Sequence, residues 1–186
     1  EPKKIFVKVN TTKITSDALI DILKDEGVTA DKTYLENALV LKLNGAVYDL
    51  ESYKKGYFHV EDLSSQLSVE ALGAFEGCTA IDVCAARGGK SFSIAEDMNN
   101  KGVLYSCDIY EQRVDLIKQG AERLGLSCIK PCVNDATVFS ESFPQADRVL
   151  CDVLCSGLGI IGKKPEIKYK KLDETKEIIP IQKKIL

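Results

Sequence analysis

Residues 82–91, DVCAARGGKS, combine glycines, a lysine and a serine in a spacing that can grip an anion. The last three, 89–91, match the end of the phosphate-binding pattern G-x-x-x-x-G-K-[ST], but Cys84 stands where its first glycine belongs. The dinucleotide pattern G-x-G-x-x-G is also absent. What remains is a short loop whose backbone N–H groups meet a predicted helix start, which suits a carboxylate.

Aspartates recur where the predicted strands end, at Asp82, Asp108, Asp135 and Asp152. Ligands of open parallel sheets bind beyond the carboxyl ends of the strands, so we expect these carboxylates along one edge. Asp108 suits a ribose, whose two hydroxyls donate to a carboxylate, although helix capping worth ~1 kcal/mol is an alternative. Asp135 could accept a hydrogen bond from the amino group of a base, and its alternative role is that of an ordinary turn residue. A ligand with a carboxylate at one end and adenosine at the other is S-adenosylmethionine.

The elements that position these residues begin after a smaller unit at the start of the chain. Residues 3–10 alternate as a strand does, and a helix capped by Ser16 is expected to end at Gly27. Asn44-Gly45 between two β-like runs predicts a type I′ hairpin. We therefore expect a small α+β domain over residues 1–55.

From residue 79 short apolar strands alternate with helices, which predicts an α/β domain with a parallel sheet over residues 56–186. Strands are expected at 79–83, 103–107, 128–133 and 147–152, and helices at 63–75, 91–98 and 110–124.

Composition excludes several classes of protein. With 45% apolar residues, 28% charged residues and a net charge of −3, the chain resembles an ordinary globular protein and not a uniformly basic one. It has no apolar run of the ~20 residues that span a bilayer and no signal peptide, so we expect a cytoplasmic protein. Five lysines surround Tyr169 in residues 163–171, a solvated loop or a local RNA-binding cluster.

Seven cysteines and one histidine raise the question of a metal. Cys128/Cys132 and Cys151/Cys155 form two C-x-x-x-C pairs, and four thiolates could hold zinc. The usual C-x-x-C spacing is absent, so we expect reduced thiols and no metal site. Cys155 follows the fourth strand, over the expected pocket, and its alternative role is that of a small buried apolar residue.

Five stretches, in order, resemble the RNA cytosine-5 methyltransferases of the Sun/RsmB type, which act on small-subunit ribosomal RNA. They are YFHVEDLSSQL, DVCAARGGKS, CDIYEQRVDLIKQGAERLG, ND and DRVLCDVLCSGLGIIGKKPEIKYK. The resemblance implies a Rossmann-like, S-adenosylmethionine-dependent methyltransferase sheet. It also implies that the cofactor is contacted by Cys84, Ala85, Ala86, Arg87, Gly88, Gly89, Lys90, Asp108, Asp135 and Asp152, with Arg113 nearby.

The mechanism that the resemblance implies follows from the poor nucleophilicity of carbon 5 of cytosine. A thiolate adds to carbon 6, carbon 5 then attacks the sulfonium methyl, and loss of the carbon 5 proton expels the thiol. In the family the attacking cysteine belongs to a later motif, and the cysteine matching Cys155 assists product release.

The sequence departs from the family pattern in three places. Arg87 and Leu154 replace prolines, which stiffen loops by fixing φ. The chain also ends at Leu186, before the family's later strands and second cysteine. We therefore expect a fragment that binds the cofactor without completing methyl transfer, and whose exposed sheet edge favours self-association. A P-loop nucleotide-binding protein and a non-catalytic RNA-binding module are the competing interpretations.

Overall fold

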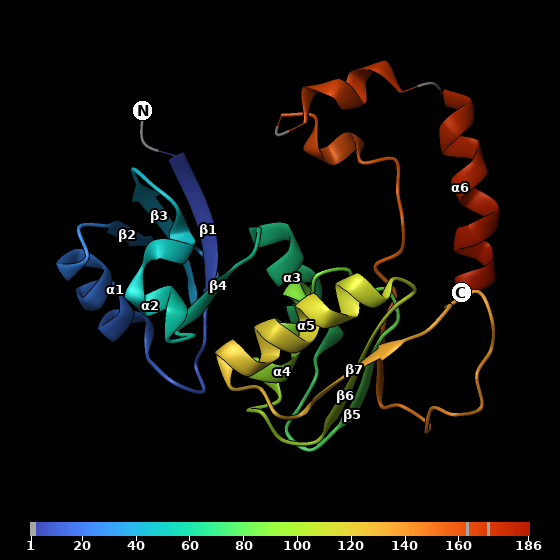
Figure 1. The fold of residues 1–186 in the computed structure, drawn as a ribbon, viewed down its shortest axis with the longest axis horizontal. Helices are drawn as coiled ribbons and strands as arrows, with labels where there is room; N and C mark the ends of the chain where they lie inside the picture. Colours follow the sequence, from blue (N-terminus) through green and yellow to red (C-terminus); the bar gives the residue numbers. More distant parts are fainter. Residues whose placement is uncertain (1–2, 163, 171) are drawn as a thin grey trace.

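The computed structural model describes residues 3–162, 164–170 and 172–186, which form two sheets followed by an extended carboxyl-terminal segment (Figure 1). The first part contains β1 (Lys3–Val9), α1 (Ser16–Asp25), β2 (Thr29–Lys32), β3 (Ala38–Leu43), η1 (Val47–Asp49), α2 (Glu51–Lys54) and β4 (Phe58–Val60). The second contains α3 (Leu63–Leu72), β5 (Thr79–Asp82), α4 (Gly89–Asp97), β6 (Val103–Asp108), α5 (Glu111–Leu124), β7 (Ile129–Val133) and β8 (Arg148–Leu150). The last segment contains η2 (Leu158–Ile160), η3 (Pro165–Tyr169) and α6 (Leu172–Ile185).

The first sheet is antiparallel, with strand order β2-β3-β1-β4. Its core is apolar and buried, and α1 contributes Leu19 and Leu23 to it. The strand and the helix expected from the sequence are therefore confirmed. The helix cap differs by one residue, because the Thr15 hydroxyl accepts from Ala18 N while Ser16 binds the Asn37 side chain.

The hairpin predicted at Asn44-Gly45 is wrong. β3 ends at Leu43, and residues 47–49 form the short helix η1 instead of a returning strand. β3 already pairs with β1 on one side and with β2 on the other, so a strand after Gly45 could not pair with β3. Non-local pairing therefore overrides a local turn signal.

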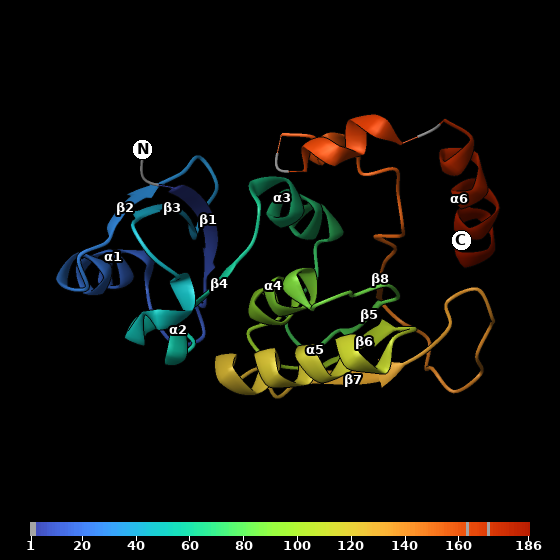
Figure 2. The same cartoon turned by 45° about the horizontal axis from the view of Figure 1, so that its top comes forward.

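β4 lies beyond residue 55, where the sequence analysis placed the end of the small domain, yet it belongs to the first sheet. It pairs with β1 through Val7↔Val60 and Val9↔Phe58. The chain then passes directly into α3, which packs beside the second sheet (Figure 2). The division into domains stays a prediction, and the sheet itself continues to Val60.

The second sheet is parallel, with strand order β7-β6-β5-β8. Helices α3, α4 and α5 pack against it over a core that includes Phe92, Ile94, Met98, Ile117 and Leu124. The expected strands and helices all occur within a few residues of their predicted bounds, so the α/β class is confirmed. This order brings the carboxyl ends of β5, β6 and β8 side by side.

No helix among the described residues is long and apolar enough to cross a membrane. The same residues contain no group of three or more His, Cys, Asp or Glu side chains that could hold a metal ion.

Candidate cofactor site

A pocket of about 450 Å³ lies at the carboxyl ends of β5 and β8; we call it the strand-end pocket. It is lined by Val60, Glu61, Asp62, Ser65, Asp82, Cys84, Ala85, Ala86, Arg87, Gly89, Lys90, Arg113 and Asp152. Its size falls in the range of small-molecule sites. Eight of the cofactor residues expected from the sequence therefore surround one cavity.

The loop between β5 and α4 is held in a left-handed turn. Ala86 has φ 53° and Gly88 φ 89°, a region that side chains other than glycine rarely adopt. A Cβ at Gly88 would lie 2.7 Å from Phe92 Cζ, so a larger residue there would require the Phe92 ring to shift. The loop is fixed from behind, because Ala85 N donates to Cys107 O at 2.7 Å. Its free side and the first turn of α4 thus face the pocket.

Asp108 ends β6 and borders the pocket through two of its lining residues. The carboxylate, 4% exposed, accepts from Ala86 N and Tyr110 N, each at 3.0 Å, and lies 3.3 Å from Arg113 Nη1. The bond from Tyr110 N to Asp108 lies one residue before α5, so it resembles the helix capping that the sequence analysis gave as the alternative role of Asp108. Arg113 Nη1 also lies 3.5 Å from the second Asp108 oxygen, so all four acceptor positions of the carboxylate have a donor, and a ligand hydroxyl would replace Arg113 there.

Lys90 and Asp152 connect the loop to the end of β8 by an ion pair of 2.6 Å. At the end of β5, burial raises the pKa of Asp82 to about 6, although a hydrogen bond from the Ser91 hydroxyl opposes the rise. Burial, and then the Asp82 and Asp108 carboxylates, raise the pKa of Cys84 to about 11. Cys84 is therefore a neutral thiol near pH 7 and not a nucleophile.

Asp135 and Cys155 are not brought into the strand-end pocket. Asp135 is exposed and closes a turn by accepting from Thr137 N at 2.9 Å and from its hydroxyl at 2.7 Å; the hydroxyl bond, then the N–H bond, lower the pKa of Asp135. Cys155 is exposed on the segment after β8. Their expected roles stay predictions.

In the lysine cluster, Lys163 and Lys171 lie outside the described residues. Lys168 Nζ lies 4.9 Å from the centre of the Tyr169 ring, which is 76% exposed. Lys170 Nζ donates to Ser156 O at 3.1 Å. Since Ser156 directly follows Cys155, this part of the lysine cluster lies near Cys155.

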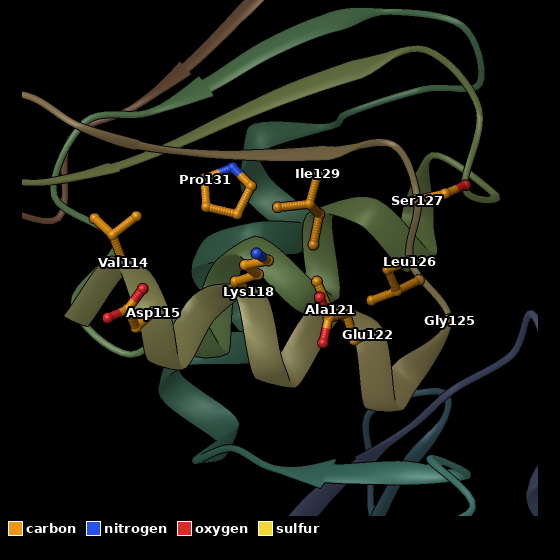
Figure 3. Close-up of a pocket in the computed structure, with 10 residues that line it drawn as sticks. All are labelled: Val114, Asp115, Lys118, Ala121, Glu122, Gly125, Leu126, Ser127, Ile129 and Pro131. Carbon is orange, nitrogen blue, oxygen red and sulfur yellow. The ribbon is translucent and has the colours of Figure 1, made fainter. Parts of the chain in front are cut away.

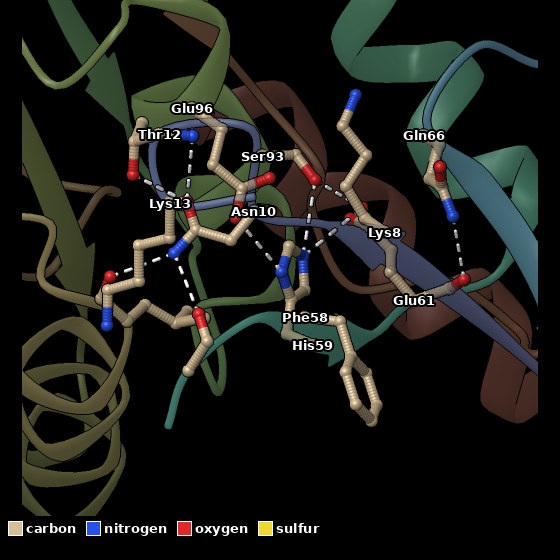
Figure 4. A network of polar contacts seen from close by, with 12 residues as sticks. Lys8, Asn10, Thr12, Lys13, Phe58, His59, Glu61, Gln66, Ser93 and Glu96 are labelled. Atoms are coloured by element: carbon tan, nitrogen blue, oxygen red, sulfur yellow. Dashed lines mark hydrogen bonds and ion pairs between the residues drawn. The ribbon is translucent and has the colours of Figure 1, made fainter. Parts of the chain in front are cut away.

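The wall formed by residues 60–65 was missed in the sequence analysis. These residues belong to the stretch YFHVEDLSSQL, which carried part of the family resemblance but received no role. Glu61 of this wall also belongs to a buried polar cluster that joins His59 on β4 to Ser93 and Glu96 on α4 (Figure 4). His59 Nδ1 lies 3.4 Å from Glu96 Oε1, and His59 Nε2 lies 3.6 Å from Glu61 Oε2. The Ser93 hydroxyl donates to the same Glu61 oxygen.

A larger pocket of about 600 Å³ lies between α5 and β7 (Figure 3). It is lined by Val114, Asp115, Lys118, Ala121, Glu122, Gly125, Leu126, Ser127, Ile129 and Pro131. It shares no lining residue with the strand-end pocket and contains none of the candidate residues.

A parallel sheet with a glycine-bearing first turn, and a pocket over its strand ends, define an α/β protein of the Rossmann-like methyltransferase class. Comparison with protein families agrees, because residues 69–186 match the family described as 16S rRNA methyltransferase RsmB/F. The chain belongs to this family.

Among curated relatives, the chain is 39% identical over 188 residues to the probable ribosomal RNA small subunit methyltransferase B of Bacillus subtilis (strain 168). The match covers 100% of this chain and 42% of the relative. A Caenorhabditis elegans protein, 26S rRNA (cytosine-C(5))-methyltransferase nsun-1, is 32% identical over 91% of this chain and 26% of its own length. The chain thus spans less than half the length of these relatives.

Solved structures share the fold. The crystal structure of PH0851 superposes with a TM-score of 0.93 at 30% identity, over 100% of this chain and 43% of that one. The structure of NSun6 from Pyrococcus horikoshii with SFG superposes with a TM-score of 0.89 at 20% identity, over 99% and 71%. The second likeness supports the fold alone.

Proposed function

We propose that the chain binds S-adenosylmethionine in the strand-end pocket, as part of an enzyme that methylates carbon 5 of a cytosine in ribosomal RNA. The observation that carries the proposal is the convergence of the loop 84–90 with Arg113 and Asp152 on one cavity bordered by Asp108. Family membership supports the same reading, since relatives are named as rRNA methyltransferases.

The donor set fits the cofactor part by part. The start of α4, with Gly89 open to the pocket, suits the methionine carboxylate, because free N–H groups and the helix dipole favour an anion there. Asp108 suits the ribose hydroxyls, with Arg113 beside it. Asp135 lies outside the strand-end pocket, so its proposed contact with the adenine amino group requires the site to extend beyond that pocket. Asp152 completes the rim through its ion pair with Lys90.

When bound, the cofactor supplies an electrophilic methyl group on a sulfonium. The contribution of this chain is to bind and orient that group, and to exclude water from it. Cys155, three residues after Asp152, is assigned to product release from the methylated base. We propose ribosomal RNA as the partner and, on that ground, a cytoplasmic location.

Calorimetric titration with S-adenosylmethionine tests the cofactor assignment. Asp108→Asn keeps the side-chain shape but removes the charge, so affinity should fall about tenfold or more through loss of charge-assisted hydrogen bonds. Asp115→Ala, an exposed aspartate on α5 that lines only the larger pocket, is the matched control and should bind like the wild type. ATP with Mg²⁺ tests the P-loop interpretation. Binding of ATP in place of S-adenosylmethionine would overturn the proposal.

A further inference from the structure

Glu61 stands at the entrance from the first sheet into the strand-end pocket, and its backbone is fixed on both sides. Its N–H donates to Phe6 O on β1 at 3.1 Å, and its C=O accepts from Gln66 Nε2 on α3 at 3.0 Å. The residue is 6% exposed and lines the pocket. The side chain therefore starts from an anchored point and has little freedom.

The two carboxylate oxygens of Glu61 have different surroundings. Oε2 accepts from the Ser93 hydroxyl and faces the His59 ring. Oε1 is buried and has no hydrogen-bond partner among the described residues. A Cβ built on Gly89 would have Oε1 as its only neighbour within 4 Å, at 3.8 Å. The unpaired oxygen thus lies beside the first residue of α4, and a buried acceptor left without a donor is costly.

The charge around Glu61 selects the kind of donor. Glu61 and Glu96 enclose a single His59, whose pKa is about 9. An ionised carboxylate oxygen only accepts hydrogen bonds, and its strongest bonds come from cationic donors, so an ammonium group suits the unpaired Oε1. The start of α4 favours an anion. A cation site and an anion site next to each other match the two ends of an α-amino acid, whose ammonium and carboxylate share one carbon.

We infer that Glu61 binds the α-ammonium group of the methionine end of the cofactor. The inference rests on the proposed function, and it gives a role to the stretch YFHVEDLSSQL. Ser93 is then a positioning residue, because it holds the other oxygen of the same carboxylate. The first sheet would contribute to the cofactor site through the residue that directly follows β4.

The test compares ligands that differ at the ammonium group. Calorimetry would use S-adenosylhomocysteine, its 2-oxo analogue with a ketone in place of the ammonium, and 5′-methylthioadenosine, which lacks the amino-acid end. In Glu61→Gln the affinity for S-adenosylhomocysteine should fall about tenfold or more, while the affinities for the other two ligands stay unchanged. Glu70→Gln, an exposed glutamate on α3, is the matched control and should leave all three affinities unchanged. Ser93→Ala should give a smaller loss with the same ligand selectivity.

Different failures have different meanings. Unchanged affinity in Glu61→Gln, or an equal loss for all three ligands, would overturn the role of Glu61 while leaving the cofactor site intact. Absence of binding of any adenosyl ligand to the wild type would overturn the proposed function itself. If Glu61→Gln does not fold, Glu61→Asp keeps the charge but withdraws the oxygen from Gly89, and the same selective loss is expected.

Discussion

Replacing His59 with glutamine should remove the contribution of this imidazole to the pH dependence of folding stability between pH 6.5 and 9. His59 is the only histidine in the chain and is 3% exposed. It faces Glu96 on α4 and Glu61 before α3, and the charge of Lys8, itself 3.4 Å from Asp97, also acts on Glu96. No other imidazole complicates the measurement.

The magnitude follows from the pKa of His59. Burial alone would lower it, but the charge of Glu96, together with hydrogen bonds to Glu61 and Glu96, raises it from 6.5 to about 9. The folded state then keeps a proton that the unfolded state loses above pH 6.5. Stabilisation is fully present below pH 6.5 and is lost as the pH rises through 9. A difference of about 2.5 pH units at about 1.36 kcal/mol each gives roughly 3 kcal/mol.

Urea unfolding of the wild type and His59→Gln at intervals from pH 6 to 9.5 measures this effect. The difference in unfolding free energy between the two proteins should decrease by about 3 kcal/mol across the window. The two proteins contain the same cysteines, so any cysteine contribution to the pH dependence cancels in the difference. The NMR signals of the single imidazole ring report its protonation directly. A ring that titrates near pH 6.5, or parallel pH profiles for the two proteins, would refute the reasoning.

Two further substitutions test the contact between the first sheet and α5. Gly56→Ala should destabilise the protein by about 3 kcal/mol or more in denaturant unfolding, because Gly56 has φ 72° and its new Cβ would lie 2.1 Å from Arg123 O. Gly73→Ala is the control and should cost only about 1–2 kcal/mol, because Gly73 has a similar φ of 61° but open space around its Cβ position. Equal losses would show that the clash is relieved. Asn10→Ala should cost about 2–4 kcal/mol, because the buried amide donates to Gly56 O at 2.9 Å and Leu124 O at 2.8 Å, and a loss below 1 kcal/mol would contradict this accounting.

The parallel sheet was predictable because its signals are local. β5 and β6 are short runs that end in Asp82 and Asp108, and α3 and α5 end at Gly73 and Gly125. The loop 84–90 and Asp152 could likewise be assigned to one cavity, because parallel strands place their carboxyl ends together.

What the sequence did not reveal depends on pairing between distant segments. The hairpin prediction at Asn44-Gly45 failed because both edges of β3 are already paired, and the local sequence does not show this. Glu61 reaches the pocket because β4 pairs with β1, 49 to 53 residues earlier in the chain, and no local pattern encodes that pairing. Asp135 accepts from Thr137 outside the strand-end pocket, and its role toward a ligand stays a prediction.

The pairing of β4 with β1 limits how this protein can be recombined with its relatives. A chimera joined after residue 55 would take Phe58–Val60 from one parent and the strand that hydrogen-bonds to it from the other. The same junction would separate Phe6 from Glu61, whose backbone bond links the first sheet to the pocket wall. Exchange of the amino-terminal unit should therefore carry residues through Glu61, so that the sheet and the wall it supports are inherited from one ancestor.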